Sequence, residues 1–96
     1  MVSKVYEFLK KVPRGKVTTY KELGRISKLH PRTVGLRMKN NKDPVNIPCY
    51  RVVRSNGTLG GYSAKEGVKK KILLLRRDGI EIRKGKINLK KYLFKF

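Results

Sequence analysis

Apolar side chains in the N-terminal segment recur three or four positions apart, which is the spacing of one face of an α-helix. Residues 3–12 carry this pattern at Val5, Phe8, Leu9 and Val12. Ser3 is suited to cap the start of such a helix. The sequence Pro-Arg-Gly at 13–15 ends it, because neither proline nor glycine continues a helix readily. We therefore expect a first helix over residues 3–12.

Residues 19–40 predict two further helices joined by a short turn. Thr19 and Glu22 have the spacing of a capping box, so the second helix is expected to run to about Ser27. Pro31 suits the first turn of a third helix that ends near Asn40. Leu23 and Ile26 should face inward, and the third helix carries the apolar residues Val34, Leu36 and Met38. The pattern is that of a helix-turn-helix pair.

The middle of the chain is harder to assign. Residues 47–53 mix β-branched side chains with a proline, so propensity does not settle their conformation, and we expect an irregular segment. Ser-Asn-Gly at 55–57 predicts a turn, and Gly60 and Gly61 predict a loop after it.

Helical spacing returns from about Lys65 and continues to Asp78, with Gly79 as a candidate left-handed cap. Its apolar positions are Val68, Ile72 and Leu75. Residues 80–96 alternate apolar and polar side chains around Arg-Lys-Gly-Lys at 83–86, so we expect a small hairpin that folds back. The expected fold is a mainly α, winged-helix-like helix-turn-helix domain with a small C-terminal hairpin, as one domain over residues 1–96.

Charge narrows the possible partners. The chain has 96 residues, with 26 Lys and Arg against 6 Asp and Glu, which gives a net charge of +20. Self-repulsion of this size favours an anionic partner, and the charges are spread over the whole chain, so nucleic acid is favoured over a polybasic membrane-surface patch. No stretch approaches the roughly 18 apolar residues of a membrane span, and no signal peptide precedes the first helix. We expect an intracellular monomer.

Cysteine and histidine content bears on the chemistry. The chain has one Cys and one His, which excludes an internal disulfide and a structural zinc site, so no metal or cofactor is expected. Most lone cysteines in intracellular proteins are ordinary buried residues, and Cys49 alone would be read in that way. His30, just before the third helix, is read as a helix-boundary residue with no chemistry.

The residues around Cys49 change that interpretation. Residues 47–53 (IPCYRVV) resemble the active-site motif of the O6-alkylguanine-DNA alkyltransferases, which usually reads Pro-Cys-His-Arg-Val. The resemblance extends in the same order to residues 15–20 (GKVTTY), 32–35 (RTVG), 55–63 (SNGTLGGYS) and 73–79 (LLLRRDG). It covers about residues 3–80, whereas the family's N-terminal α/β domain has no counterpart in these 96 residues.

The resemblance implies roles in contacting DNA. The helix-turn-helix would enter the minor groove, and Arg32 would fill the gap left by an extruded guanine. Tyr20 would rotate the target phosphate and donate its hydroxyl to the flipped base, with Thr19 at the entry of the same helix. Ser63 would hydrogen-bond the O6 atom. Such extrusion is needed because a stacked base hides its O6 substituent.

The resemblance also implies roles in the transfer itself. Cys49 would accept the alkyl group irreversibly, and Asn41 would brace the turn that carries it. Tyr50 and Asp78 stand where the family has a histidine and a glutamate that relay the thiol proton. Tyrosine is a much weaker base, so Tyr50 is either a hydrogen-bonding spacer or a relay, and Arg51 is a candidate source of positive potential.

Three functions follow as hypotheses. The first is repair of duplex DNA containing O6-alkylguanine, by stoichiometric transfer to Cys49 without a cofactor, in the cytoplasm near the nucleoid or in a eukaryotic nucleus. The second is an alkyltransferase-like protein that binds the lesion and recruits excision repair; such proteins typically lack the cysteine, which favours transfer. The third is a basic architectural nucleic-acid-binding protein in which Cys49 has no chemical role.

Overall fold

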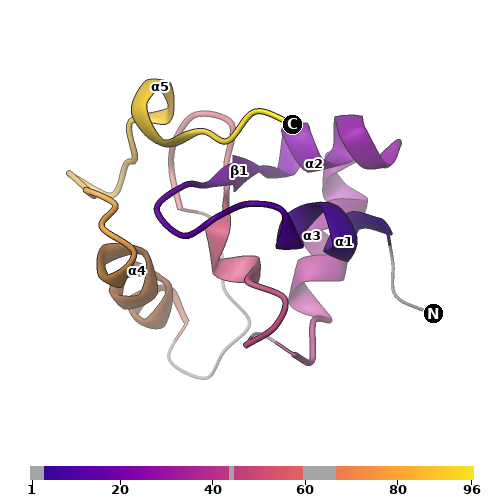
Figure 1. Ribbon diagram of the computed structural model, residues 1–96, viewed down its shortest axis with the longest axis horizontal. Helices are drawn as coiled ribbons and strands as arrows, with labels where there is room; N and C mark the ends of the chain where they lie inside the picture. The colour runs from indigo at the N-terminus through magenta and orange to yellow at the C-terminus, as the bar shows by residue number, and fades with distance from the viewer. Residues whose placement is uncertain (1–3, 44, 60–66) are drawn as a thin grey trace.

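The computed structural model describes residues 4–43, 45–59 and 67–96. Its helical elements are α1 (Lys4–Lys10), α2 (Tyr20–Ser27), α3 (Pro31–Lys39), the 3₁₀ helix η1 (Cys49–Arg51), α4 (Val68–Arg77) and α5 (Leu89–Tyr92). The predicted mainly α class is confirmed. Figure 1 shows α1, α2 and α3 gathered on one side of the molecule and α4 and α5 on the other. Within those ranges, no helix is long and apolar enough to cross a bilayer.

The helix-turn-helix forms as expected. The Thr19 side chain caps α2 by accepting a 3.0 Å hydrogen bond from the amide of Glu22. The imidazole of His30 caps α3 in the same way, accepting from the amide of Arg32 at 3.0 Å. His30 is thus a helix-boundary residue. On α3, Val34 and Met38 are buried, whereas Leu36 is 56% exposed and does not belong to the core.

The turn between α2 and α3 depends on one glycine. Lys28 ends α2 in the left-handed region with φ 58°, and the amide of Leu29 returns to the carbonyl of Gly24 at 2.8 Å. A Cβ atom at Gly24 would lie 2.5 Å from the Leu29 carbonyl oxygen. Real Cβ atoms essentially never approach backbone that closely, so a larger side chain at this position would force the two helices apart.

The expectation that residues 47–53 are irregular was wrong for residues 49–53. Cys49–Arg51 form η1, and Val52–Val53 form β2, which pairs in parallel with β1 (Thr18–Thr19) in the register Thr18 to Val52. Both valines of β2 are fully buried. A two-residue pairing between segments more than thirty positions apart is set by tertiary packing, and local propensity could not reveal it.

Helix α4 is confirmed, but its buried face differs from the expected one. Leu75 is fully buried, whereas Val68 is 42% exposed and Lys71 is fully buried in its place. Asp78 caps the C-terminus, and Gly79 follows with φ 88°, the left-handed conformation predicted for it. Lys65 lies outside the described residues.

The C-terminal tail has only the turn of the predicted hairpin. Arg83 and Lys86 form an antiparallel bridge around that turn, but Leu89 begins the short helix α5 where a second strand was expected. The Asn88 side chain caps α5 by accepting from the amide of Lys90, which is why the chain turns helical. The tail does fold back, because Leu93 forms a parallel bridge with Val17 beside β1.

Two apolar clusters make up the core. The helical cluster contains Val5, Leu9, Val12, Leu23, Val34, Met38, Cys49 and Val52. The tail cluster contains Val17, Tyr50, Val53, Leu59, Leu75, Ile80, Ile87 and Tyr92. Residues 49–53 supply both clusters, so the segment that carries the cysteine lies between them. We refer to residues 49–53 as the seam.

The close approach at Gly24 gives a stability prediction. Gly24→Ala should lower the free energy of unfolding by roughly 1–3 kcal/mol, the usual cost of overpacking. Gly35→Ala is the matched control, because a Cβ atom on Gly35 in α3 meets nothing within 4 Å. That control should be neutral or stabilise by up to about 1 kcal/mol through helix propensity. Urea unfolding measures both, and equal effects would contradict the turn geometry.

Candidate active site and DNA-binding surface

Cys49 is the first residue of η1 and belongs to the helical cluster. Its side chain is only 4% exposed and packs with residues of α1, α2 and α3. Tyr6 and Tyr20 are partly buried neighbours in the same cluster. Burial is the main cause that raises the pKa of both phenols, and the proximity of Cys49 also raises it, whereas Arg37 lowers the pKa of Tyr6 and Arg54 lowers that of Tyr20. The thiol therefore lies in mostly apolar surroundings, and Tyr6 and Tyr20 pack against the same cluster.

Asn41 braces the approach to the cysteine. Its side-chain amide donates to the carbonyl of Ile47 at 2.8 Å, and its side-chain oxygen accepts from the amide of Asp43 at 3.0 Å. The amide of Cys49 donates back to the same Ile47 carbonyl at 2.8 Å. Asn41 and Cys49 therefore share one acceptor just before the turn that carries the cysteine, and the bracing role of Asn41 stays a prediction.

A polar network surrounds Asp78 on the tail side of the seam. The hydroxyl of Tyr50 donates to the Asp78 carboxylate at 2.7 Å, and Nε of Arg51 donates to the same oxygen at 3.1 Å. Arg14 reaches the other oxygen, with its Nε at 3.3 Å. Arg51 also donates to the carbonyl of Val12 at 2.9 Å. Tyr50 and Arg51 of η1 are thus hydrogen-bonded to Asp78 at the end of α4, and Arg51 also to Val12 in the segment that follows α1.

This network fixes the orientation of Tyr50 and Arg51. The Tyr50 proton points to Asp78, and burial together with that hydrogen bond raises the pKa of the phenol above its ordinary 10.0. Its contribution to stability is full below the ordinary value and is lost as the pH rises through the folded value. The Arg51 side chain is 15% exposed and points into the molecule. Tyr50 is therefore placed as a hydrogen-bond donor to Asp78.

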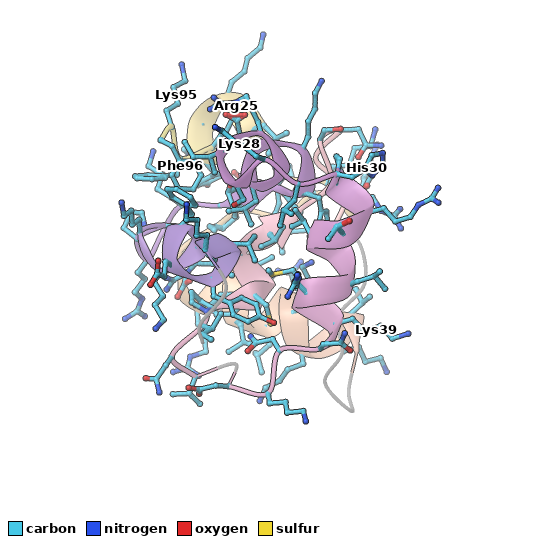
Figure 2. The ribbon with its side chains drawn as sticks, turned by 90° about the vertical axis from the view of Figure 1, so that its right-hand side faces the viewer. Arg25, Lys28, His30, Lys39, Lys95 and Phe96 are labelled. Atoms are coloured by element: carbon cyan, nitrogen blue, oxygen red, sulfur yellow. The ribbon has the colours of Figure 1, made fainter. Side chains whose placement is uncertain are left out.

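The residues expected to contact DNA lie on α2 and α3. Thr19 is buried and caps α2, and Tyr20 begins that helix. Arg32 is exposed in the first turn of α3. Figure 2 shows basic side chains, including Arg25, Lys28 and Lys39, extending outward from these helices and the turn between them. Ser63 lies outside the described residues, so its expected hydrogen bond to the O6 atom remains a prediction.

The structure adds one residue that the sequence pattern had not singled out. Lys71 is fully buried on α4, and its ammonium donates to the carbonyl of Val52 at 2.7 Å and to that of Leu59. It lies 5.9 Å from the centre of the Tyr20 ring. Lys71 is four residues before Leu75 and so shares its helix face, which was an available signal. A lysine within a run of three is normally solvated, so the pattern did not single it out. In the described part of the chain, no group of three His, Cys, Asp or Glu side chains could hold a metal.

Comparison with known protein families identifies the domain. Residues 1–80 match the family described as the DNA binding domain of 6-O-methylguanine DNA methyltransferase. A bifunctional methyltransferase/endonuclease from Picrophilus torridus is 45% identical over 98 residues, covering 98% of this chain and 32% of that protein. A methylated-DNA–protein-cysteine methyltransferase from Thermococcus sibiricus is 44% identical over 79 residues, covering 81% of this chain and 43% of that protein. The chain thus spans less than half the length of these relatives.

Solved structures share the fold. The Atl1 protein of S. pombe, in complex with damaged DNA containing O6-carboxymethylguanine, aligns with a TM-score of 0.86 at 32% identity. That alignment covers 97% of this chain and 93% of Atl1. The O6-methylguanine-DNA methyltransferase of Pyrococcus kodakaraensis aligns with a TM-score of 0.73 at 45% identity, over 80% of this chain and 44% of that one.

The Asp78 network predicts a large and local loss of stability. Asp78→Ala leaves the Tyr50 hydroxyl and the Arg51 guanidinium without their shared acceptor, which should lower the free energy of unfolding by roughly 3 kcal/mol. The control is Glu81→Ala, since Glu81 is half exposed and pairs with the exposed Arg83. Removing that surface pair should change stability by about 0.5 kcal/mol or less. Equal losses in urea unfolding would mean that the network does not hold the seam.

Proposed function

Because the chain belongs to the family of the 6-O-methylguanine DNA methyltransferase DNA-binding domain, we propose that it repairs O6-alkylguanine in duplex DNA by moving the alkyl group to its own Cys49. The observation that carries this proposal is the position of Cys49, buried at the start of η1 beneath the helix-turn-helix. A site behind a DNA-binding element suits a base that has left the stack. The protein acts as a monomer and needs no cofactor.

The reaction is a single displacement. The Cys49 thiol loses its proton, and the sulfur attacks the alkyl carbon of the lesion in line with the bond to O6. A bond forms between carbon and sulfur while the carbon–O6 bond breaks, and O6 keeps the electron pair. The guanine then takes up one proton, so the net products are unmodified guanine and a thioether. The thioether is stable because a thiolate leaves poorly from an unactivated alkyl carbon, so each molecule repairs one lesion.

The helix-turn-helix would extrude the damaged base from the duplex and bring it to Cys49. Extrusion of a base costs a few kcal/mol of stacking, and a long cationic side chain can fill the gap. Arg32 is exposed at the start of α3 and is the proposed plug. Tyr20 contacts the helical cluster that contains Cys49, and we assign its hydroxyl to the flipped base. Ser63 is the proposed partner of the O6 atom.

The remaining site residues hold the cysteine in place. Asn41 and Cys49 both donate to the Ile47 carbonyl, and the Asp78 carboxylate accepts hydrogen bonds from Tyr50 and Arg51. A phenol that already donates to a carboxylate is a poor acceptor for the thiol proton at neutral pH. We therefore assign Tyr50 the spacer role and Asp78 the role of its anchor.

The rival function is lesion binding without transfer. It gains weight from Atl1, which matches this chain over most of both lengths and was solved with damaged DNA. The two functions share the fold and the DNA surface, so only the fate of the alkyl group separates them. Cys49, within a run that resembles the family's active-site motif, favours transfer.

The direct test is the mass of the protein after incubation with duplex DNA containing O6-methylguanine. Wild type should gain one methyl group, about 14 Da by the chemistry of thiol alkylation, on the peptide that contains Cys49. Cys49→Ala should gain nothing yet still bind the lesion. An unchanged mass of wild type with retained lesion binding would establish the rival function, and methylation of Cys49→Ala would exclude Cys49 as the acceptor.

A second prediction separates the plug from general charge. Arg32→Ala should reduce the extruded population of a 2-aminopurine probe and slow transfer roughly tenfold, equivalent to about 1.4 kcal/mol. Lys39→Ala is the control, because Lys39 is exposed at the other end of α3 (Figure 2). Both variants lose one positive charge and should weaken binding to undamaged duplex similarly. A control that slows transfer as much as Arg32→Ala would remove the case for the plug.

A further inference from the structure

A groove runs between α1 and the end of α2. Its volume is about 290 Å³, close to the lower end of the range of roughly 300–1,000 Å³ for small-molecule sites. A groove of this size suits an apolar side chain of a partner better than a whole cofactor. Its lining includes Lys4, Glu7, Phe8 and Lys11, in and just after α1, and Ile26 and Lys28 at the end of α2.

The floor of the groove is apolar and held in place. Phe8 and Ile26 both pack against the helical cluster. The ring of Phe96 meets that of Phe8 edge to face, with the ring centres 6.0 Å apart, and Phe94 meets Phe96 in the same way at 5.2 Å. The amide of Phe94 donates to the carbonyl of Val17 at 2.8 Å, which fixes the tail beside β1. The floor is therefore formed before a partner arrives, which lowers the entropy cost of binding.

The rim of the groove is cationic. Lys4, Lys11 and Lys28 are exposed there, and Glu7 is the acidic residue of the lining, which gives it a net charge of +2. Lys28 ends α2 in the left-handed region, with φ 58°. Glycine adopts that conformation at lower cost, so the backbone does not explain a lysine at this position. A rim of this charge favours an acidic partner.

The groove lies apart from the helix expected to contact DNA. Figure 2 shows Phe96 and Lys28 toward the upper left of the molecule, and His30 and Lys39 along α3 at the right. None of the lining residues belongs to α3. A duplex bound through Arg32 and the rest of α3 would therefore leave the groove accessible.

We propose that this groove docks an acidic segment of a partner protein. An apolar side chain of that segment contacts Phe8 and Ile26, and its carboxylates pair with the lysines of the rim. The protein then holds duplex DNA on α3 and a second protein in the groove at the same time. This docking goes beyond the proposed function, and it stands whether or not Cys49 accepts the alkyl group.

Two other occupants fit the groove less well. A second copy of the chain carries the same net charge of +20, which opposes association of two copies. A nucleic-acid strand presents phosphates, which Glu7 repels, and bases, which bind by stacking on aromatic faces. The Lys11 ammonium lies over the Phe8 ring, 5.4 Å from its centre, and leaves that face unavailable for stacking. An aliphatic side chain needs only an apolar surface, which the floor provides.

The test is a titration of the full chain with the blocked peptide Glu-Asp-Glu-Phe-Leu-Glu-Asp-Glu, followed by the amide NMR signals. Signals of the groove lining should shift. Replacing the Phe-Leu pair of the peptide by Ala-Ala should weaken binding roughly tenfold or more, since the apolar anchor is lost. Absence of binding, or equal affinity for the two peptides, would overturn the proposal, because the contact would then be charge alone.

A pair of adjacent lysines separates the groove from the overall charge. Lys11→Glu should weaken binding of the peptide roughly tenfold at about 0.15 M salt, where charges more than roughly 8 Å apart are largely screened. Lys10→Glu is the matched control, because Lys10 is exposed on α1 but outside the groove lining and the change in net charge is the same. The control should change the affinity less than about twofold. Equal losses would overturn the proposal.

A last titration tests whether DNA and the peptide bind together. The peptide should still shift the groove signals of protein saturated with duplex DNA containing O6-methylguanine. DNA, whether duplex or single-stranded, that shifts the groove signals and displaces the peptide would assign the groove to nucleic acid and overturn the docking of a protein. The mass of the Cys49 peptide is measured separately, so failure of alkyl transfer and failure of docking are distinguishable.

Discussion

The structure depends on burial of the seam between two apolar clusters. Cys49 and Val52 face the helical cluster, whereas Tyr50 and Val53 face the tail cluster. Alternation of this kind lets one short segment hold the helix-turn-helix and the C-terminal half together, and the parallel pairing of β2 with β1 fixes its register. Cys49 is thus part of the main packing interface of the molecule, and its position is determined by the whole core.

Hydrogen bonds from polar side chains also fix the position of the seam. Asn41 holds the chain just before Cys49, and Asp78 holds Tyr50 and Arg51 just after it. Lys71 anchors the following strand through the carbonyl of Val52. These buried or half-buried interactions have good geometry and few alternatives, so they specify one arrangement of the seam. These interactions would hold Cys49 in a fixed position for the proposed transfer.

Sequence reasoning succeeded where the signal was local. The second and third helices followed from Thr19, Glu22 and Pro31, whose capping chemistry acts within one helical turn. It failed where distant segments meet, as in the pairing of β1 with β2 and in the tail, where the cap at Asn88 outweighed an alternating pattern.

In the candidate site, too, the sequence identified residues within motifs but not the contacts that depend on tertiary packing. Cys49, Tyr50 and Asp78 were identified because the sequence matches the family's motifs in the same order. The structure brings Tyr50 and Asp78, which are 28 positions apart, into contact. The direction of the Tyr50 hydrogen bond was not predictable, since it depends on the tertiary position of the carboxylate. Lys71 was missed because a lysine among lysines is normally solvated, and only the packing of α4 buries it.

The proposed activity is direct reversal of the lesion, with one turnover per molecule. The most direct measurement is the amount of O6-methylguanine remaining in duplex DNA when the protein is the limiting component. The number of lesions removed should rise in proportion to the protein added and stop at one per molecule, with unmodified guanine in their place. Lesions that persist unchanged at saturating protein, or removal that continues beyond one per molecule, would contradict it.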